Sequence, residues 1–420
     1  MKRTKLALAL VSTFLLCALS VNLGGCSAQI QAKDLMEKIT PNEVTPLDDL
    51  DVQSADMTDF AVRLFQSSEK EGENTLISPL SVICALAMVL NGAEGETKAQ
   101  MEAMLGMSAE ELNLYLYSYV NSLPHGEKYK LSLANSIWFA DGNRIDVNGD
   151  FLQTNADYYG ADIYEAPFDE STLKDINNWV KKETDGMIPE ILDEIPADAL
   201  MYLINALAFE AQWREAYDES QIKDGIFTKE DGTKQDAEFM YGMESGYFDD
   251  GNATGFIKYY DDEKYAFVAM LPNEGVSVSE YVDSLDGEEL CAMLSSPQSV
   301  DVMTSMPKFE IEYGTELSDA LKAMGITDAF STSECDLSGI GRPAAGDLFI
   351  GKVIHKTYIS VSEKGTRAGA VTSIEATNGG VSAPISKPKT VYLDRPFVYM
   401  LVDCETNVPL FMGTVTDIEN

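Results

Sequence analysis

The sequence has few basic residues for its length. Of its 420 residues, 30 are Lys or Arg and 69 are Asp or Glu, which gives a formal net charge of −39. Nucleic acids and anionic membranes are bound through clusters of cations, so a chain of this charge is not expected to bind either through a basic patch. An acidic, soluble, extracellular surface fits this composition better.

Cysteine is also sparse, and no metal or cofactor motif is present. The four cysteines that follow residue 26 are isolated and form no C-x-x-C pair: Cys84, Cys291, Cys335 and Cys404. We expect them to be small buried hydrophobic residues rather than disulfides. The glycines of Gly339-Ile340-Gly341 lack the later spacing of a dinucleotide site. The sequence therefore predicts no cofactor and no metal.

A short targeting segment opens the chain. Lys2, Arg3 and Lys5 precede an apolar stretch from Leu6 to Ser20, which is too short to read as a spanning helix. We interpret residues 1–25 as a signal peptide.

The motif Leu23-Gly24-Gly25-Cys26 resembles the lipobox of bacterial lipoproteins. That resemblance implies that Cys26 is acylated and holds the protein at the outside of a bacterial membrane. An ordinary signal peptide with an incidental cysteine is the alternative. Residues 26–56 are polar and rich in Asp, Glu and Pro, and we expect them to be a tether between lipid and body.

Residues 57–420 contain no repeat or linker, so we expect one domain. Val82 to Leu90 is apolar all round, which predicts a fully buried helix opened by Ser78-Pro79. Leu317 to Met324 predicts another helix, with Thr315 as its cap.

Strands are indicated by alternation of apolar and polar residues from Leu131 to Phe139 and from Tyr265 to Leu271. Residues 397–403 and 410–415 predict an antiparallel hairpin. Helices concentrated early and strands late favour an α+β fold over alternating βαβ units.

Six short motifs, in order along the chain, carry a family resemblance. They are Asn74 to Val82, Gly92 to Thr97, Ile176 to Val180 with Gly186 to Ile188, Leu203 to Ala206 with Trp213, Met306 to Phe309, and Ile354 to Lys356. Together they resemble the serpin family of serine protease inhibitors from about Phe60 to the end. The resemblance implies three β-sheets, about eight or nine helices and an exposed reactive-centre loop at about 363–390.

Small residues fill the stretch that corresponds to this loop. Alternate residues from Thr366 to Ala376, which would share one face of a strand, are all uncharged. The two charged residues, Arg367 and Glu375, would both lie on the opposite face. Such a segment can become a strand with one face on a core and one in water. A flexible surface loop is the plain alternative, but it does not need this pattern.

The resemblance implies a mechanism for this segment. A serine protease, or a cysteine protease as a second class, cuts the loop and forms an acyl-enzyme, and the freed loop inserts into a sheet and distorts the covalently held protease. The resemblance implies that this chain is an inhibitor and not an enzyme. It implies no oligomer, so we expect a monomer. The implied hinge begins at Glu363 and continues with the small residues Gly365, Thr366, Ala368, Gly369 and Ala370. Arg367 and Val371 depart from the family pattern.

Two further groups of residues follow from the resemblance. The shutter beneath the opening sheet would be formed by Ser78, Ser81, Asn205 and His355, and the breach at its top by Trp213, Lys308 and Glu363. A hydrolase would need His355 or His125 beside an activated nucleophile, but no G-x-S-x-G motif is present. We therefore favour a hydrogen-bonding role for His355.

Counting along the loop places the nominal cut at Gly379–Gly380. The expected scissile region comprises Thr377, Asn378, Gly379, Gly380, Val381 and Ile385, and it contains no Lys or Arg. Trypsin-like targets need a cation at this position, so elastase-like or subtilisin-like targets are favoured. Two alternatives remain at this point: a non-inhibitory serpin that acts as a binding module, and an unrelated solute-binding lipoprotein.

Overall fold

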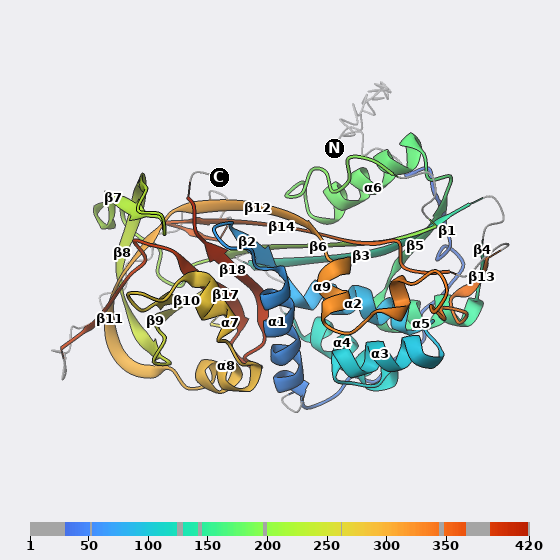
Figure 1. Cartoon of the computed structure of the whole chain (residues 1–420), viewed down its shortest axis with the longest axis horizontal. Helices are drawn as coiled ribbons and strands as arrows, with labels where there is room; N and C mark the ends of the chain where they lie inside the picture. Colours follow the sequence, from blue (N-terminus) through green and yellow to red (C-terminus); the bar gives the residue numbers. More distant parts are fainter. Residues whose placement is uncertain are drawn as a thin grey trace, which may run out of the picture.

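The computed structural model describes residues 30–50, 53–123, 129–141, 145–195, 200–261, 263–343, 348–366 and 387–418. Figure 1 shows an elongated molecule in which one long sheet runs between helices on both of its faces. Among the described residues, no helix is long and apolar enough to cross a membrane. No group of three or more His, Cys, Asp or Glu in the same ranges is placed to hold a metal ion.

The large sheet has seven strands, in the order β1-β5-β3-β6-β15-β14-β12. β6 and β14 are parallel and also pair directly with each other, whereas β15 is antiparallel to both. Their bounds are β1 Lys33–Asp34, β5 Asp162–Ala166, β3 Tyr129–Ala140, β6 Met201–Gln212, β15 Gly365–Thr366, β14 Lys352–Ser362 and β12 Phe309–Glu316.

A nine-stranded sheet fills the other end of the molecule, in the order β16-β11-β8-β9-β10-β17-β18-β2, with β7 paired to β8. Its strands are β16 Lys389–Tyr392, β11 Gln298–Pro307, β8 Lys234–Asp249, β9 Ala253–Tyr259, β10 Tyr265–Pro272, β17 Phe397–Asp403, β18 Pro409–Val415, β2 Thr75–Ile77 and β7 Ile222–Thr228. β13 Gly341–Pro343 and β4 Ile145–Val147 form a third, two-stranded sheet.

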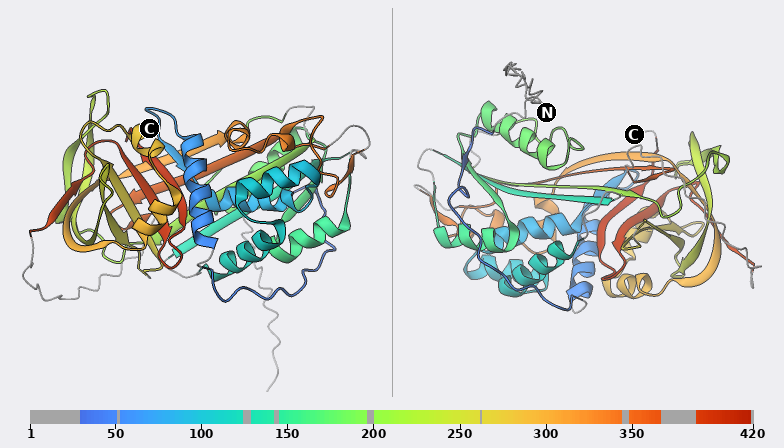
Figure 2. Two further views of the ribbon diagram at one scale, coloured as in Figure 1. Left: turned by 60° about the horizontal axis from the view of Figure 1, so that its bottom comes forward. Right: turned by 180° about the vertical axis from the view of Figure 1, so that it is seen from behind.

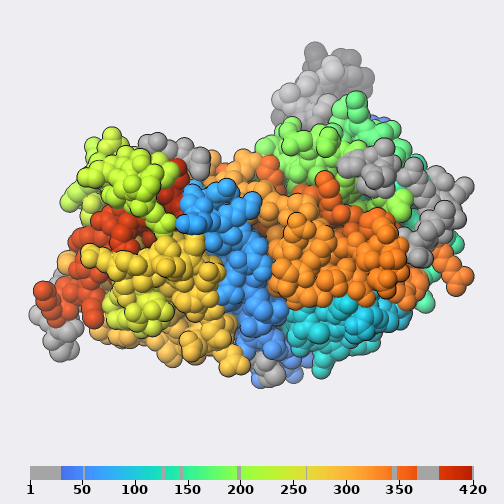
Figure 3. Space-filling model, viewed as in Figure 1, coloured from blue at the N-terminus to red at the C-terminus, as the bar shows by residue number. Residues whose placement is uncertain are grey.

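Nine α-helices lie within the described ranges, and with the three sheets they confirm the predicted α+β fold. One helix, α6, covers one face of the large sheet, and α2 to α5 lie on the opposite face (Figures 1 and 2). The helices are α1 Ser54–Ser68, α2 Pro79–Leu90, α3 Gly95–Leu105, α4 Ala109–Ser122, α5 Gly149–Tyr159, α6 Glu170–Glu183, α7 Val278–Asp283, α8 Gly287–Leu294 and α9 Ser318–Ala323. Figure 3 shows α1 at the surface between the two ends of the molecule.

Helix α2 is the buried helix that the sequence predicts. All of its residues are buried, the Ser78 hydroxyl accepts the backbone N–H of Ser81, and Pro79 occupies the first turn, where a missing N–H costs nothing. The predicted cap of α9 is wrong, because Thr315 lies inside β12, which continues to Glu316 opposite Ile354.

The described part of the expected tether lies along the body instead of spacing it from a membrane. β1 pairs with β5, and the Asp175 carboxylate of α6 accepts the backbone N–H groups of Gln31 and Ala32, both at 2.8 Å. Farther along, Asn42 donates to Asp157 through its backbone N–H at 2.7 Å. Within residues 30–50, the segment expected to be a tether is therefore packed against the body at these contacts.

Candidate functional site: the seam of the large sheet and the start of the loop

The site is the seam of the large sheet, by which we mean the parallel contact between β6 and β14. Its paired residues run from Tyr202 opposite Lys352 to Ala208 opposite Tyr358. Parallel pairing is slightly less stable per residue than antiparallel pairing. A strand that separates β6 from β14 and runs antiparallel to both replaces one parallel contact with two antiparallel ones.

The structure brings the four predicted shutter residues together beneath the middle of the seam. The Ser81 hydroxyl donates to Asn205 Oδ1 at 2.7 Å, and the same oxygen lies 2.7 Å from His355 Nδ1. The backbone N–H of Ser78 donates to His355 Nε2 at 3.1 Å. Asn205 and His355 face each other across the seam, so their hydrogen bond links the two strands that an inserted strand would separate.

These contacts define the state of His355. Its Nε2 accepts a hydrogen bond, so the proton of the neutral ring is on Nδ1, which donates to Asn205. Full burial lowers the pKa of His355 to about 3, which keeps the ring neutral near pH 7. A side chain with no exposed surface cannot reach a substrate, so this geometry favours a structural role over a catalytic one.

The start of the loop already lies within the large sheet. Gly365 pairs with Gln212 of β6 and Ser362 of β14, and Thr366 pairs with Ala211 and Val361. Gly365 has φ 151°, and an added Cβ would lie 2.1 Å from the carbonyl oxygen of Ala211. Only glycine fits at this position without moving the backbone.

Above the seam, the predicted breach residues also meet. Lys308 Nζ lies 3.0 Å from Glu363 and 3.3 Å from Glu238. Partial burial acts to raise the pKa of Glu363, but its hydrogen bonds and the Lys308 charge outweigh burial and lower it. The Trp213 indole N–H donates to the carbonyl of Ser362 at 2.8 Å, so it holds the turn that precedes β15.

Sequence reasoning missed four residues that support the breach, Tyr260, Lys258, Tyr217 and Glu244. Tyr260 stacks on Trp213 with ring centroids 4.5 Å apart, and its hydroxyl lies 2.5 Å from that of Thr366. Lys258 is almost fully buried over the rings of Trp213 and Tyr217 and pairs with Glu244 at 2.9 Å. A lysine in an otherwise apolar strand was the available signal, because a buried cation needs a carboxylate partner.

Several predicted residues lie outside the described residues. They are Cys26, the later hinge residues Ala368, Gly369 and Ala370, and the scissile residues Thr377, Asn378, Gly379, Gly380, Val381 and Ile385. Their assignments stay predictions.

Comparison with known proteins identifies the class. The leukocyte elastase inhibitor of Bos taurus is 31% identical over 381 residues, which cover 86% of this chain and 98% of that protein. The solved structure of the thermophilic serpin tengpin in its native state matches with a TM-score of 0.88 and 46% identity, over 92% of this chain and 100% of that chain. The same serpin in its latent state matches with a TM-score of 0.78 and 45% identity, over 89% and 99%.

The model of the family described as Serpin (serine protease inhibitor) matches residues 55–418. This chain belongs to the serpin family. The TM-score is higher for the native form of tengpin, 0.88, than for its latent form, 0.78. In this chain, Gly365 and Thr366 are the only described residues that lie between β6 and β14.

Proposed function

We propose that the protein inhibits serine proteases by trapping them as a suicide substrate. The observation that supports this most directly is β15, where two residues of the loop occupy the top of the seam antiparallel to both of its strands. After a protease cuts the loop and forms an acyl-enzyme, the segment that follows Thr366 continues down the same path. The attached protease is carried along and distorted before the ester is hydrolysed.

Insertion of the loop would release enough free energy to distort the active site of the attached protease. About ten inserted residues that each gain a net ~1 kcal/mol from hydrogen bonding release on the order of 10 kcal/mol, before packing is added. The buried face of the new strand would be formed by the uncharged alternate residues that begin at Thr366. Thr366 itself is already fully buried in β15. The shutter contact between Asn205 and His355 would break as the strand passes.

For the target, we propose an elastase-like or subtilisin-like protease, with a cysteine protease as the second class. Support comes from the absence of Lys and Arg between Thr377 and Ile385 and from the leukocyte elastase inhibitors among the relatives. Mass spectrometry of the C-terminal peptide released by elastase would identify the scissile bond.

The decisive experiment mixes the protein with elastase and separates the products on a denaturing gel. We expect a covalent complex that survives SDS. Thr366→Arg should abolish the complex and leave only clean cleavage, because Thr366 is fully buried at the top of the seam and an unpaired charge there would block the path of the inserting loop. Thr366→Ser, which keeps a small hydroxyl, should still form the complex.

Clean cleavage of the unmodified protein by every elastase-like, subtilisin-like and cysteine protease tested would reject trapping. It would favour the second candidate, a non-inhibitory serpin that acts as a binding module.

For location, we propose an extracellular lipoprotein anchored to a bacterial membrane through Cys26. The lipobox-like motif is the support. The protein from whole cells should partition into detergent, and Cys26→Ser should move it to the aqueous phase. Aqueous partitioning of the unmodified protein would contradict the anchor.

A further inference from the structure

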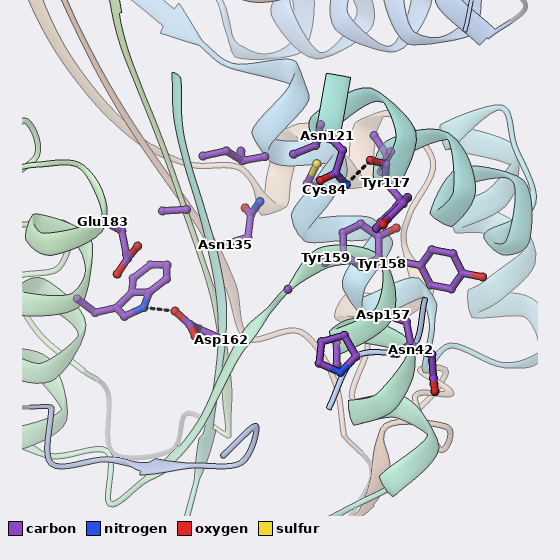
Figure 4. Close-up of a pocket in the computed structure, with 18 residues that line it drawn as sticks. Asn42, Cys84, Tyr117, Asn121, Asn135, Asp157, Tyr158, Tyr159, Asp162 and Glu183 are labelled. Atoms are coloured by element: carbon purple, nitrogen blue, oxygen red, sulfur yellow. Dashed lines mark hydrogen bonds between the residues drawn. The ribbon is translucent and has the colours of Figure 1, made fainter. Parts of the chain in front are cut away.

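A cavity of about 410 Å³ opens at the side of the large sheet, away from the seam (Figure 4). Its walls come from α4 and α5 on one face of the sheet, α6 on the other, and the N-terminal segment at Pro41 and Asn42. The size is in the range of small-molecule sites, which is about 300–1,000 Å³.

The sheet itself explains why this space exists. β5 pairs with β3 only from Ser136 opposite Asp162 onward. Before that point, Leu133 to Asn135 line the cavity where β5 has not yet joined the sheet. A ligand here would touch strands and helices from both faces at once.

Charge in the cavity has one sign. Three carboxylates, those of Asp157, Asp162 and Glu183, line it, and none of the described lining residues is Lys or Arg. Lys182, next to the cavity on α6, pairs with Glu183 at 2.7 Å but is largely exposed. Asp162 receives the indole N–H of Trp179 at 2.7 Å and has no ion pair with a described Lys or Arg.

The half-buried position of Asp162 makes its charge costly. Burial is the main cause that raises its pKa, and the charges of Glu183 and Asp34 raise it further, against the hydrogen bond from Trp179 and the charge of Lys182. A cation bound beside Asp162 would relieve this cost.

Four aromatic side chains, Tyr117, Tyr158, Tyr159 and Trp179, form part of the walls. Figure 4 shows Tyr158 and Tyr159 across the cavity from Asp162 and Glu183. Cys84, whose thiol is fully buried, also lines the cavity, and burial raises its pKa to about 12, so it stays an apolar surface near neutral pH. Carboxylates together with aromatic faces select a cation that carries an apolar body.

The cavity also connects to the shutter. Asn135 lines it and accepts a hydrogen bond from Asn205 Nδ2 at 2.6 Å, and Asn205 in turn binds His355 across the seam. A ligand that fixes Asn135 therefore favours the arrangement in which the seam is closed.

We propose that this cavity binds a small organic cation, an amine on a flat aromatic body, and that the bound amine opposes insertion of the loop. The amine lies against Asp162 and Glu183, and the ring packs against the tyrosines. The binding site stands on the cavity alone, whereas its effect on insertion rests on the proposed function.

The test titrates the full protein with tryptamine by calorimetry. Tryptophol and indole-3-propionate, which carry a neutral and an anionic group on the same ring, are the comparators. We expect tryptamine to bind and the comparators to bind at least tenfold more weakly. Equal binding of all three, or no binding of tryptamine, would overturn the site.

Variants locate the ligand. Asp162→Asn should weaken tryptamine at least tenfold, whereas Asp319→Asn, a change at an almost fully exposed carboxylate on α9, should not. Glu183→Gln serves as the second variant if Asp162→Asn does not fold, and it should weaken binding severalfold. Unchanged affinity for tryptamine in Asp162→Asn would show that the ligand does not bind at this cavity. If only Glu183→Gln folds, unchanged affinity in that variant would show the same.

A separate readout tests the effect on insertion. Saturating tryptamine should raise the unfolding temperature of the intact protein more than that of the protein cut in its loop, and should increase cleavage relative to trapping. Equal shifts of the unfolding temperature in the intact and the cut protein would reject the effect on insertion, but the binding site would stand. If the unmodified protein traps no protease but tryptamine still binds, the proposed function fails and the site stands.

Discussion

The hydroxyl of Tyr260 and the hydroxyl of Thr366 lie 2.5 Å apart, and both side chains are fully buried. Tyr260 follows β9 in the nine-stranded sheet, and Thr366 ends β15 in the large sheet. The contact therefore connects the loop to a part of the molecule that does not belong to the large sheet. It helps to hold Gly365 and Thr366 within the large sheet of the intact chain.

Tyr260→Phe removes this hydrogen bond and leaves the ring in place. We expect a loss of about 1 kcal/mol in stability and faster digestion at the hinge by a non-target protease. Tyr399→Phe is the matched control, because the buried Tyr399 hydroxyl has no hydrogen-bond partner among the described residues. Limited proteolysis with peptide mapping measures the effect. Equal digestion of the two variants would show that the contact does not hold the hinge.

Gly365→Ala should expel β15 from the large sheet. The new Cβ would collide with the backbone of Ala211, and the φ of 151° is unfavourable for alanine. We expect a loss of about 1–3 kcal/mol and exposure of the hinge to proteolysis. Gly149→Ala, at a helix start with open space around it, should leave both unchanged. A hinge in Gly365→Ala that stays as protected as in Gly149→Ala would contradict the close packing.

His355 should make the native form sensitive to acid. Its pKa is about 3 when folded and about 6.5 when unfolded, so the unfolded chain binds one more proton between these values. Stability therefore falls as the pH drops from about 6.5 towards 3, by about 1.4 kcal/mol per pH unit from this group. Urea unfolding midpoints between pH 7 and pH 4 measure the slope. His355→Asn should show a smaller slope, and an unchanged one would exclude His355 as its source.

Asp175→Ala should release the start of the N-terminal segment. Asp175 is 3% exposed and its carboxylate accepts two backbone N–H groups, so its loss should cost about 2 kcal/mol. Hydrogen exchange of residues 31–34 should rise strongly. Lys33→Ala, which removes an exposed ion pair with Glu165, should cost less than about 1 kcal/mol. If exchange stays slow in Asp175→Ala, the pairing of β1 with β5 is enough to hold the N-terminal segment on the body.

The elements with a strong local pattern were predictable from the sequence. Helix α2 is apolar all round with a Ser-Pro start, and the alternation of Leu131 to Phe139 marks β3. The cap of α9 was not predictable, because Thr315 is placed by pairing of β12 with β14, which local propensity does not contain.

The shutter and breach residues came from family resemblance, and the structure brings both groups together. Their partners Tyr260 and Lys258 were missed because they are distant in sequence and carry no motif. The position of β15 was missed for a different reason. Composition shows that the segment can form a strand, but the pairing of Gly365 with Gln212 and Ser362 depends on the folded sheet.

The two-residue strand β1 has a consequence for how the protein behaves in a crowded solution. It covers the outer side of β5, which would otherwise offer unpaired backbone groups to a second molecule. Lys33 belongs to β1 itself and is exposed, and a lysine on an edge strand discourages pairing with a second molecule. These residues precede the region that matches the family model, residues 55–418, so the cover over β5 comes from a segment outside that region.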